Sequence, residues 1–128
     1  MKTDLPAHFQ NLILDIVGAG KMDNNLITEI VKSNKLSEKD INSFTTFNHI
    51  NSESYGRKLI FDNGNFKILL MSWKAGDFTA IHNHGYTEWG CVYFFGEATN
   101  RLYEIDNDEL KVVQKDNFHH GEIASVCG

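Results

Sequence analysis

Residues 76–96 read GDFTAIHNHGYTEWGCVYFFG and contain two histidines separated by a single residue. Residues i and i+2 of a strand point to the same side, so the side chains of His82 and His84 are expected to converge on one point. Two neutral imidazoles placed in this way can share a metal ion. The alternative is a pair of exposed histidines on an edge strand. The glycines on both sides favour the metal interpretation, because they allow tight turns beside a narrow site.

The sequence around this segment is typical of short β-strands. Tyr55, Arg57, Leu59 and Phe61 alternate with the residues between them, which predicts a strand with these four side chains on one inward face. The sequence Asp-Asn-Gly-Asn at 62–65 predicts a hairpin turn. The nearly apolar residues that follow predict a second strand, covered on both faces. The expected strands after Tyr55 are 55–61, 66–73, 78–84, 89–95, 100–105, 110–114 and 122–126.

The first 48 residues have the periodicity of helices rather than strands. Apolar residues recur at the spacing of one buried helix face, and residues 18–20 (Gly-Ala-Gly) end the first helix. Asp23 or Asn24 can cap the second helix, and residues 37–40 resemble a capping box for a third. The expected buried positions are Phe9, Leu12, Ile13, Ile16, Val17, Leu26, Ile27, Ile30, Val31, Ile41, Phe44 and Phe47. A small helical segment therefore precedes a mostly β region, which is expected to be an antiparallel barrel.

Composition narrows the classes of function. The 128 residues are 41% hydrophobic and 23% charged, as in ordinary globular domains. No apolar run approaches the roughly 20 residues of a membrane span, so we expect no membrane partner. The net charge is −5 and basic residues do not cluster, which argues against nucleic acid. The two cysteines and the lack of a signal sequence predict a cytoplasmic protein with a small-molecule partner.

The spacing Gly-x5-His-x-His-x3-Glu-x7-Gly, from Gly76 to Gly96, resembles the first motif of the cupin superfamily. It is preceded by Tyr-x-Arg at 55–57, Asn-Gly-Asn at 63–65 and Trp73. In this order, the motifs resemble the cysteine dioxygenase type I family of thiol dioxygenases over about residues 55–126. The resemblance implies one cupin domain over residues 1–128, with a helical part at 1–50 and an antiparallel jelly-roll barrel at 51–128.

The resemblance also implies the chemistry of the site. His82 and His84 would hold Fe(II), Arg57 would bind the substrate carboxylate, and Tyr55 would support that arginine through its hydroxyl. The substrate would be a small thiol of the cysteine or 3-mercaptopropionate class, oxidised by O₂ to a sulfinic acid. From the residues alone, an arginine on an inward face needs a partner, which can be a ligand carboxylate or a structural acidic residue. Tyr55 can equally be a core tyrosine.

The third metal ligand is the main departure from the family pattern. Family members use a third histidine after a Gly-x-Val/Ile-Ala segment, and residues 121–126 (GEIASV) match that lead-in. The histidine would then lie beyond Gly128, so the barrel is expected to be truncated at its C-terminus. If the chain ends at Gly128, we expect it to bind iron weakly. The alternatives are another metal-dependent cupin enzyme that uses Glu88 with the two histidines, or a non-catalytic cupin that binds small molecules.

Two further positions complete the predictions. Some family members carry a cysteine, cross-linked to a tyrosine, five residues after the second histidine, and Trp89 occupies that position here. We therefore predict no cross-link, with Cys91 a small core residue. His119 and His120 precede Gly121 and are expected to be exposed loop residues rather than ligands.

Overall fold

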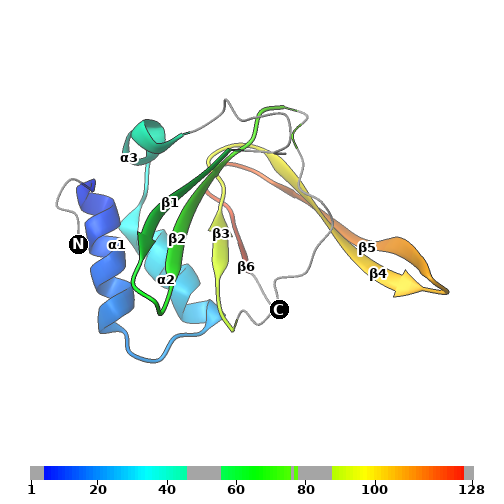
Figure 1. Ribbon diagram of the computed structural model, residues 1–128, viewed down its shortest axis with the longest axis horizontal. Helices are drawn as coiled ribbons and strands as arrows, with labels where there is room; N and C mark the ends of the chain where they lie inside the picture. The colour runs from blue at the N-terminus through cyan, green and yellow to red at the C-terminus, as the bar shows by residue number, and fades with distance from the viewer. Residues whose placement is uncertain (1–4, 46–55, 76, 78–87, 126–128) are drawn as a thin grey trace. The chain divides into compact units, whose positions relative to one another are not determined.

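The computed structural model describes residues 5–45, 56–75, 77 and 88–125. The chain divides into two compact units, one comprising Met1–Lys35 and His84–Gly128, the other Leu36–Asn83. The structure is mostly sheet with a few helices, as predicted (Figure 1). The described strands pair only as three two-stranded antiparallel sheets, so in this part of the chain the expected closed barrel is absent.

In the first unit, helices α1 (Ala7–Gly18) and α2 (Asn24–Asn34) lie side by side (Figure 1). The Asp23 side chain caps α2 by accepting a hydrogen bond of 2.8 Å from the Leu26 amide. The predicted apolar faces are largely confirmed, but Val17 and Leu26 are wrong because 58% and 37% of these residues are exposed. The buried residues of the two helices are Phe9, Leu12, Ile13, Ile16, Ile27 and Val31.

A short sheet packs against α2 in the same unit. Strands β3 (Cys91–Tyr93) and β6 (Ile123–Ser125) pair antiparallel, and both contact α2. The Gly90 amide donates a hydrogen bond of 2.7 Å to Asn24 Oδ1 at the start of α2. Strand β3 is shorter than the predicted strand 89–95, and β6 begins one residue later than predicted.

A long hairpin joins β4 (Ala98–Asp106) to β5 (Glu109–Phe118). Its turn residues, Asn107 and Asp108, have φ of 51° and 62°. Positive φ at both central residues defines a type I′ turn, which matches the right-handed twist of a hairpin. The turn lies between the expected strands 100–105 and 110–114, and both strands are longer than expected.

The second unit contains α3 (Glu38–Ile41), the 3₁₀ turn η1 (Asn42–Phe44), β1 (Gly56–Asp62) and β2 (Lys67–Ser72). The predicted capping box is confirmed: the Asp40 carboxylate accepts a hydrogen bond of 2.8 Å from the Ser37 amide. The helix is a single turn, and Phe47 lies outside the described residues.

Candidate functional site

The turn of the β1–β2 hairpin is built by side chains that hydrogen-bond their own backbone. The Asp62 carboxylate accepts from the Gly64 amide at 2.9 Å, and Asn63 Oδ1 accepts from the amides of Asn65 and Phe66 at 2.9 and 3.1 Å. Gly64 has φ of 87°, a conformation that residues with a Cβ rarely adopt. The predicted turn at 62–65 is therefore confirmed, and it fixes where the two strands start to pair.

The pairing register contains a β-bulge at Ile60. Asp62 pairs with Lys67 and Phe61 with Ile68, but the next pair is Leu59 with Leu69, which leaves Ile60 without a partner. Without the bulge, Ile60 would pair with Leu69, and every earlier residue of β1 would move to the opposite face. The sequence predicts Phe61 on the same face as Leu59. That prediction is wrong. Paired residues share a face, and Leu59 pairs with Leu69, whereas Phe61 pairs with Ile68, whose side chain lies on the opposite face of β2.

The bulge decides which side chains accompany Arg57. Arg57 pairs with Met71, so it shares a face with Leu59, Leu69 and Lys67. In an unbulged hairpin, Arg57 would pair with Ser72, on the face opposite to Lys67. The extra residue therefore brings two cationic side chains to one side of the hairpin.

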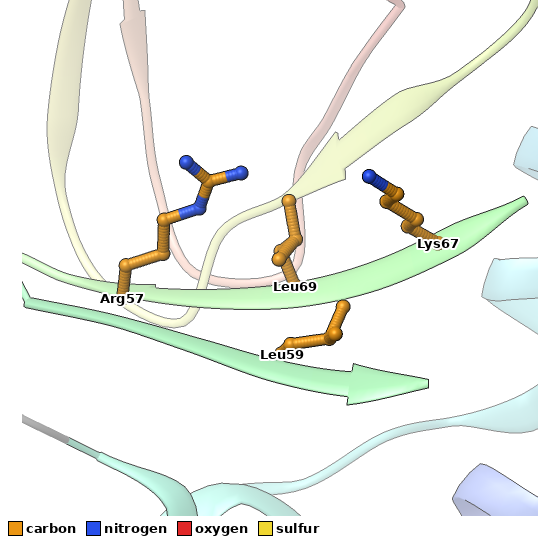
Figure 2. A pocket seen from close by; sticks show the side chains of 4 residues that line it. All are labelled: Arg57, Leu59, Lys67 and Leu69. Carbon is orange, nitrogen blue, oxygen red and sulfur yellow. The ribbon is translucent and has the colours of Figure 1, made fainter. Parts of the chain in front are cut away.

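These side chains surround a concave site, which we call the Arg57 hollow. Its volume is about 390 Å³, and its lining residues are Arg57, Leu59, Lys67 and Leu69. Figure 2 shows the two charged heads leaning inward from opposite ends, with the leucines between them. The hollow is open to solvent rather than enclosed. The hollow therefore combines an apolar floor with positive charge at each end.

The two charged side chains of the Arg57 hollow are exposed to solvent. Arg57 is exposed rather than buried, so the prediction of an inward-facing arginine is wrong in its burial. Leu59 is 50% exposed, which confirms that this face is open in the described structure. Within the described residues, neither Arg57 nor Lys67 forms an ion pair or a side-chain hydrogen bond. Asp62 is the cross-strand backbone partner of Lys67, but its carboxylate accepts a hydrogen bond from the Gly64 amide in the turn.

Three of the predicted site residues, Tyr55, His82 and His84, lie outside the described residues. The same holds for the expected strand at 78–84. Glu88 is described and exposed. The described residues contain no group of three or more His, Cys, Asp or Glu side chains able to hold a metal ion. The metal site thus stays a prediction from the sequence.

His119 and His120 are exposed, as predicted, and both contact neighbouring groups. His119 Nδ1 lies 3.6 Å from Glu97 Oε1, and its amide donates to Glu122 Oε1 at 2.7 Å. His120 Nδ1 lies 2.9 Å from the Phe95 carbonyl oxygen. Because a carbonyl only accepts, this contact requires a proton on Nδ1. The two histidines therefore hold together the turns at 96–97 and 119–122.

Cys91 lies on β3 and is a free thiol that is half-buried. Burial raises the pKa of this thiol above its ordinary value of 9.0. A thiol that keeps its proton is a poor nucleophile and a poor metal ligand. The raised pKa favours the predicted packing role over a reactive one, although Cys91 is half-buried rather than a fully buried core residue.

Sequence reasoning missed Lys67. The available signal was the Asn-Gly turn, because counting outward from it pairs Asp62 with Lys67. The same counting without a bulge puts Lys67 and Arg57 on opposite faces. The residues at 59–61 do not predict the bulge, since all three are apolar and suit a strand.

None of the helices in the described ranges is long and apolar enough to span a membrane.

A family model for cysteine dioxygenase type I matches residues 1–125 of the chain. The comparison with curated proteins found no match, and the comparison with solved structures found none either. The family match spans nearly all 128 residues, including the helical part that precedes the motifs. It indicates an oxidoreductase of the dioxygenase class. The chain belongs to the cysteine dioxygenase type I family, which implies a cupin fold.

Proposed function

We propose that this protein is a non-haem Fe(II) dioxygenase that oxidises L-cysteine, or a similar small thiol with a carboxylate, to its sulfinic acid. The family match over residues 1–125 carries the proposal. In this reaction both atoms of O₂ are added to the sulfur of one thiol, so the sulfur is oxidised and dioxygen is reduced without another reductant. The cationic Arg57 hollow supports it, because the carboxylate of such a substrate is ionised at neutral pH.

The proposed metal ligands fit Fe(II) by their donor chemistry. His82 and His84 offer two imidazoles one residue apart, and imidazole is a common ligand of iron. The third ligand is the histidine that the family pattern places after the segment at 121–126, or, as the alternative, Glu88. Bound Fe(II) would supply the redox chemistry that allows dioxygen to react with sulfur.

The protein's own residues would bind and orient the substrate. The Arg57 guanidinium is planar and can donate two parallel hydrogen bonds to a carboxylate, which fixes the direction of the attached thiol. Tyr55 is proposed to support this arginine. Leu59 and Leu69 provide an apolar floor that contacts the carbon skeleton of the substrate.

The proposal is tested by oxygen uptake. The purified protein, loaded with Fe(II), is given L-cysteine, 3-mercaptopropionate and a thiol that lacks a carboxylate. We expect consumption of one O₂ per thiol with the acids, and both atoms of isotopically labelled O₂ in the product by mass spectrometry. No oxygen uptake with any carboxylate thiol, in a protein that has bound stoichiometric iron, would contradict the proposal.

The Glu88→Gln variant distinguishes the proposed function from the alternative, a cupin enzyme that uses Glu88 as a metal ligand. If Glu88 is not a ligand, this variant keeps the iron content and thiol turnover of the parent protein. Loss of iron would instead assign Glu88 to the metal and favour the second enzyme class. A protein that binds no iron or manganese at all would favour the non-catalytic binding protein.

A further inference from the structure

We infer that the Arg57 hollow recognises small molecules with two acidic groups, with Arg57 holding one and Lys67 the other. The pairing register carries the inference. The bulge at Ile60 places Arg57 and Lys67 on one face of the hairpin, whereas regular pairing would separate them. Bulges commonly redirect a side chain beside a functional site, and here the redirected side chain is Arg57.

The spacing of the two cations suits a ligand with an acid at each end. Met71, the cross-strand partner of Arg57, and Lys67 are four residues apart on β2, or about 13 Å of extended strand. Both side chains are long, and their heads lean toward each other over Leu69 (Figure 2). The gap between the charges is therefore shorter than the separation of their backbones. A short diacid fits that gap, with its methylene groups above the leucines.

The charge of the site supports the same ligand class. The chain as a whole carries −5, yet within the described residues neither cation of the hollow has an ion-pair partner. Two like charges that face one concavity repel each other, and a ligand with one acid neutralises only one of them. A ligand with two acids satisfies both. Assigning this ligand as the substrate rests on the proposed function, and it makes the substrate a thiol dicarboxylate.

The test measures binding with ligands that cannot be oxidised at sulfur. Glutarate and pentanoate have the same carbon chain, but only glutarate has a second carboxylate. Each is titrated into the whole protein and followed by NMR shifts of the hairpin amides. We expect glutarate to bind about fivefold more tightly than pentanoate, as for a partly exposed ion pair, and the preference to weaken with salt.

Three variants identify the cation responsible. Lys67→Gln is expected to remove the preference for glutarate over pentanoate, whereas Lys67→Arg keeps the preference. Lys58→Gln is the matched control, because Lys58 is an exposed lysine on the opposite face of the same hairpin. Equal affinities in the parent protein, or an equal loss in Lys58→Gln, would overturn the inference.

Turnover provides the second measurement and separates this inference from the proposed function. Lys67→Gln is expected to lower the kcat/KM for mercaptosuccinate, divided by the kcat/KM for 3-mercaptopropionate, about fivefold. An unchanged ratio would overturn the substrate assignment. Glutarate binding needs neither iron nor oxygen. A glutarate preference without thiol oxidation would therefore refute the proposed function and leave the two-acid site standing. Thiol oxidation without that preference would refute only the two-acid site.

Discussion

Arg57 is proposed to bind the substrate carboxylate, and its removal is expected to affect catalysis without affecting iron. Arg57→Ala should lower kcat/KM for carboxylate thiols by about 10- to 100-fold, because a hydrogen bond to a charged group contributes about 1.5–3 kcal/mol. Iron content should stay unchanged. Arg101→Ala, at an exposed arginine of β4, is the control. Normal turnover of cysteine by Arg57→Ala would contradict the carboxylate-binding role.

Cys91 provides a prediction on pH dependence. Its thiol has a raised pKa in the folded protein, so between the ordinary value of 9.0 and the raised value the folded state holds a proton that the unfolded state has lost. The contribution of Cys91 to the free energy of unfolding is therefore complete below pH 9 and decreases as the pH rises above it.

The measurement is the rate of alkylation by iodoacetamide, in a Cys127→Ser background that leaves Cys91 as the one cysteine. We expect the rate to rise with pH through a midpoint above 9.0, and the urea-unfolded chain to show the ordinary midpoint. A folded-state midpoint at or below the unfolded one would mean that burial does not control this thiol.

At the scale of the element, the β1–β2 turn depends on the conformation of Gly64. Gly64→Ala is expected to lower the free energy of unfolding by about 1–2 kcal/mol, because φ of 87° is strained for any residue with a Cβ. Gly18→Ala is the matched control. An added Cβ meets nothing within 4 Å at either glycine, but Gly18 is helical.

Urea unfolding checks this pair of variants. Gly18→Ala should be neutral or slightly stabilising, since alanine is a better helix former than glycine. Equal effects of the two substitutions would show that backbone conformation is not the cause.

The elements that the sequence predicted best are those decided by local chemistry. The turn at 62–65 is fixed by Asn and Asp side chains bonded to nearby amides, and the Asp23 cap by a contact three residues away. Ile60 shows the limit of such reasoning. Whether β1 bulges depends on its pairing with β2. The alternation of side chains within β1 alone does not determine that pairing. The prediction for Val17 is wrong for a similar reason, because helix periodicity locates the buried face of a helix but not how wide that face is.

At the scale of the whole molecule, iron binding should appear as thermal stability. A ligand that binds only the folded state raises the midpoint of unfolding as its concentration rises. We expect Fe(II), added without oxygen, to raise the Tm of the parent protein and to have no effect on His82→Ala. His8→Ala, at an exposed histidine of α1, is the control and should respond like the parent. An equal response of His82→Ala would remove that histidine from the metal site.

The whole-molecule predictions were the least complete. The family, the β-rich character and the helical start followed from motifs and periodicity, and the family match confirms the first of these. The closed barrel was inferred from the regular spacing of strands. That spacing cannot specify which strands pair over long separations, and the described strands pair as separate sheets. Tyr55, His82 and His84 remain predictions.

The side-chain hydrogen bonds of the β1–β2 turn also bear on how the protein ages. An Asn-Gly sequence loses ammonia when the glycine nitrogen attacks the asparagine side-chain carbon to form a succinimide. Water then opens this ring to aspartate or isoaspartate. At this turn the Gly64 amide is held by Asp62, and Asn63 Oδ1 accepts two further amides. We expect deamidation at Asn63 to be slow in the folded chain and fast in urea, as peptide mapping of isoaspartate would show. Equal rates would contradict this protection. Each conversion adds a negative charge to the hairpin that carries Arg57, so protein that has unfolded and refolded would return with a lower affinity for anions.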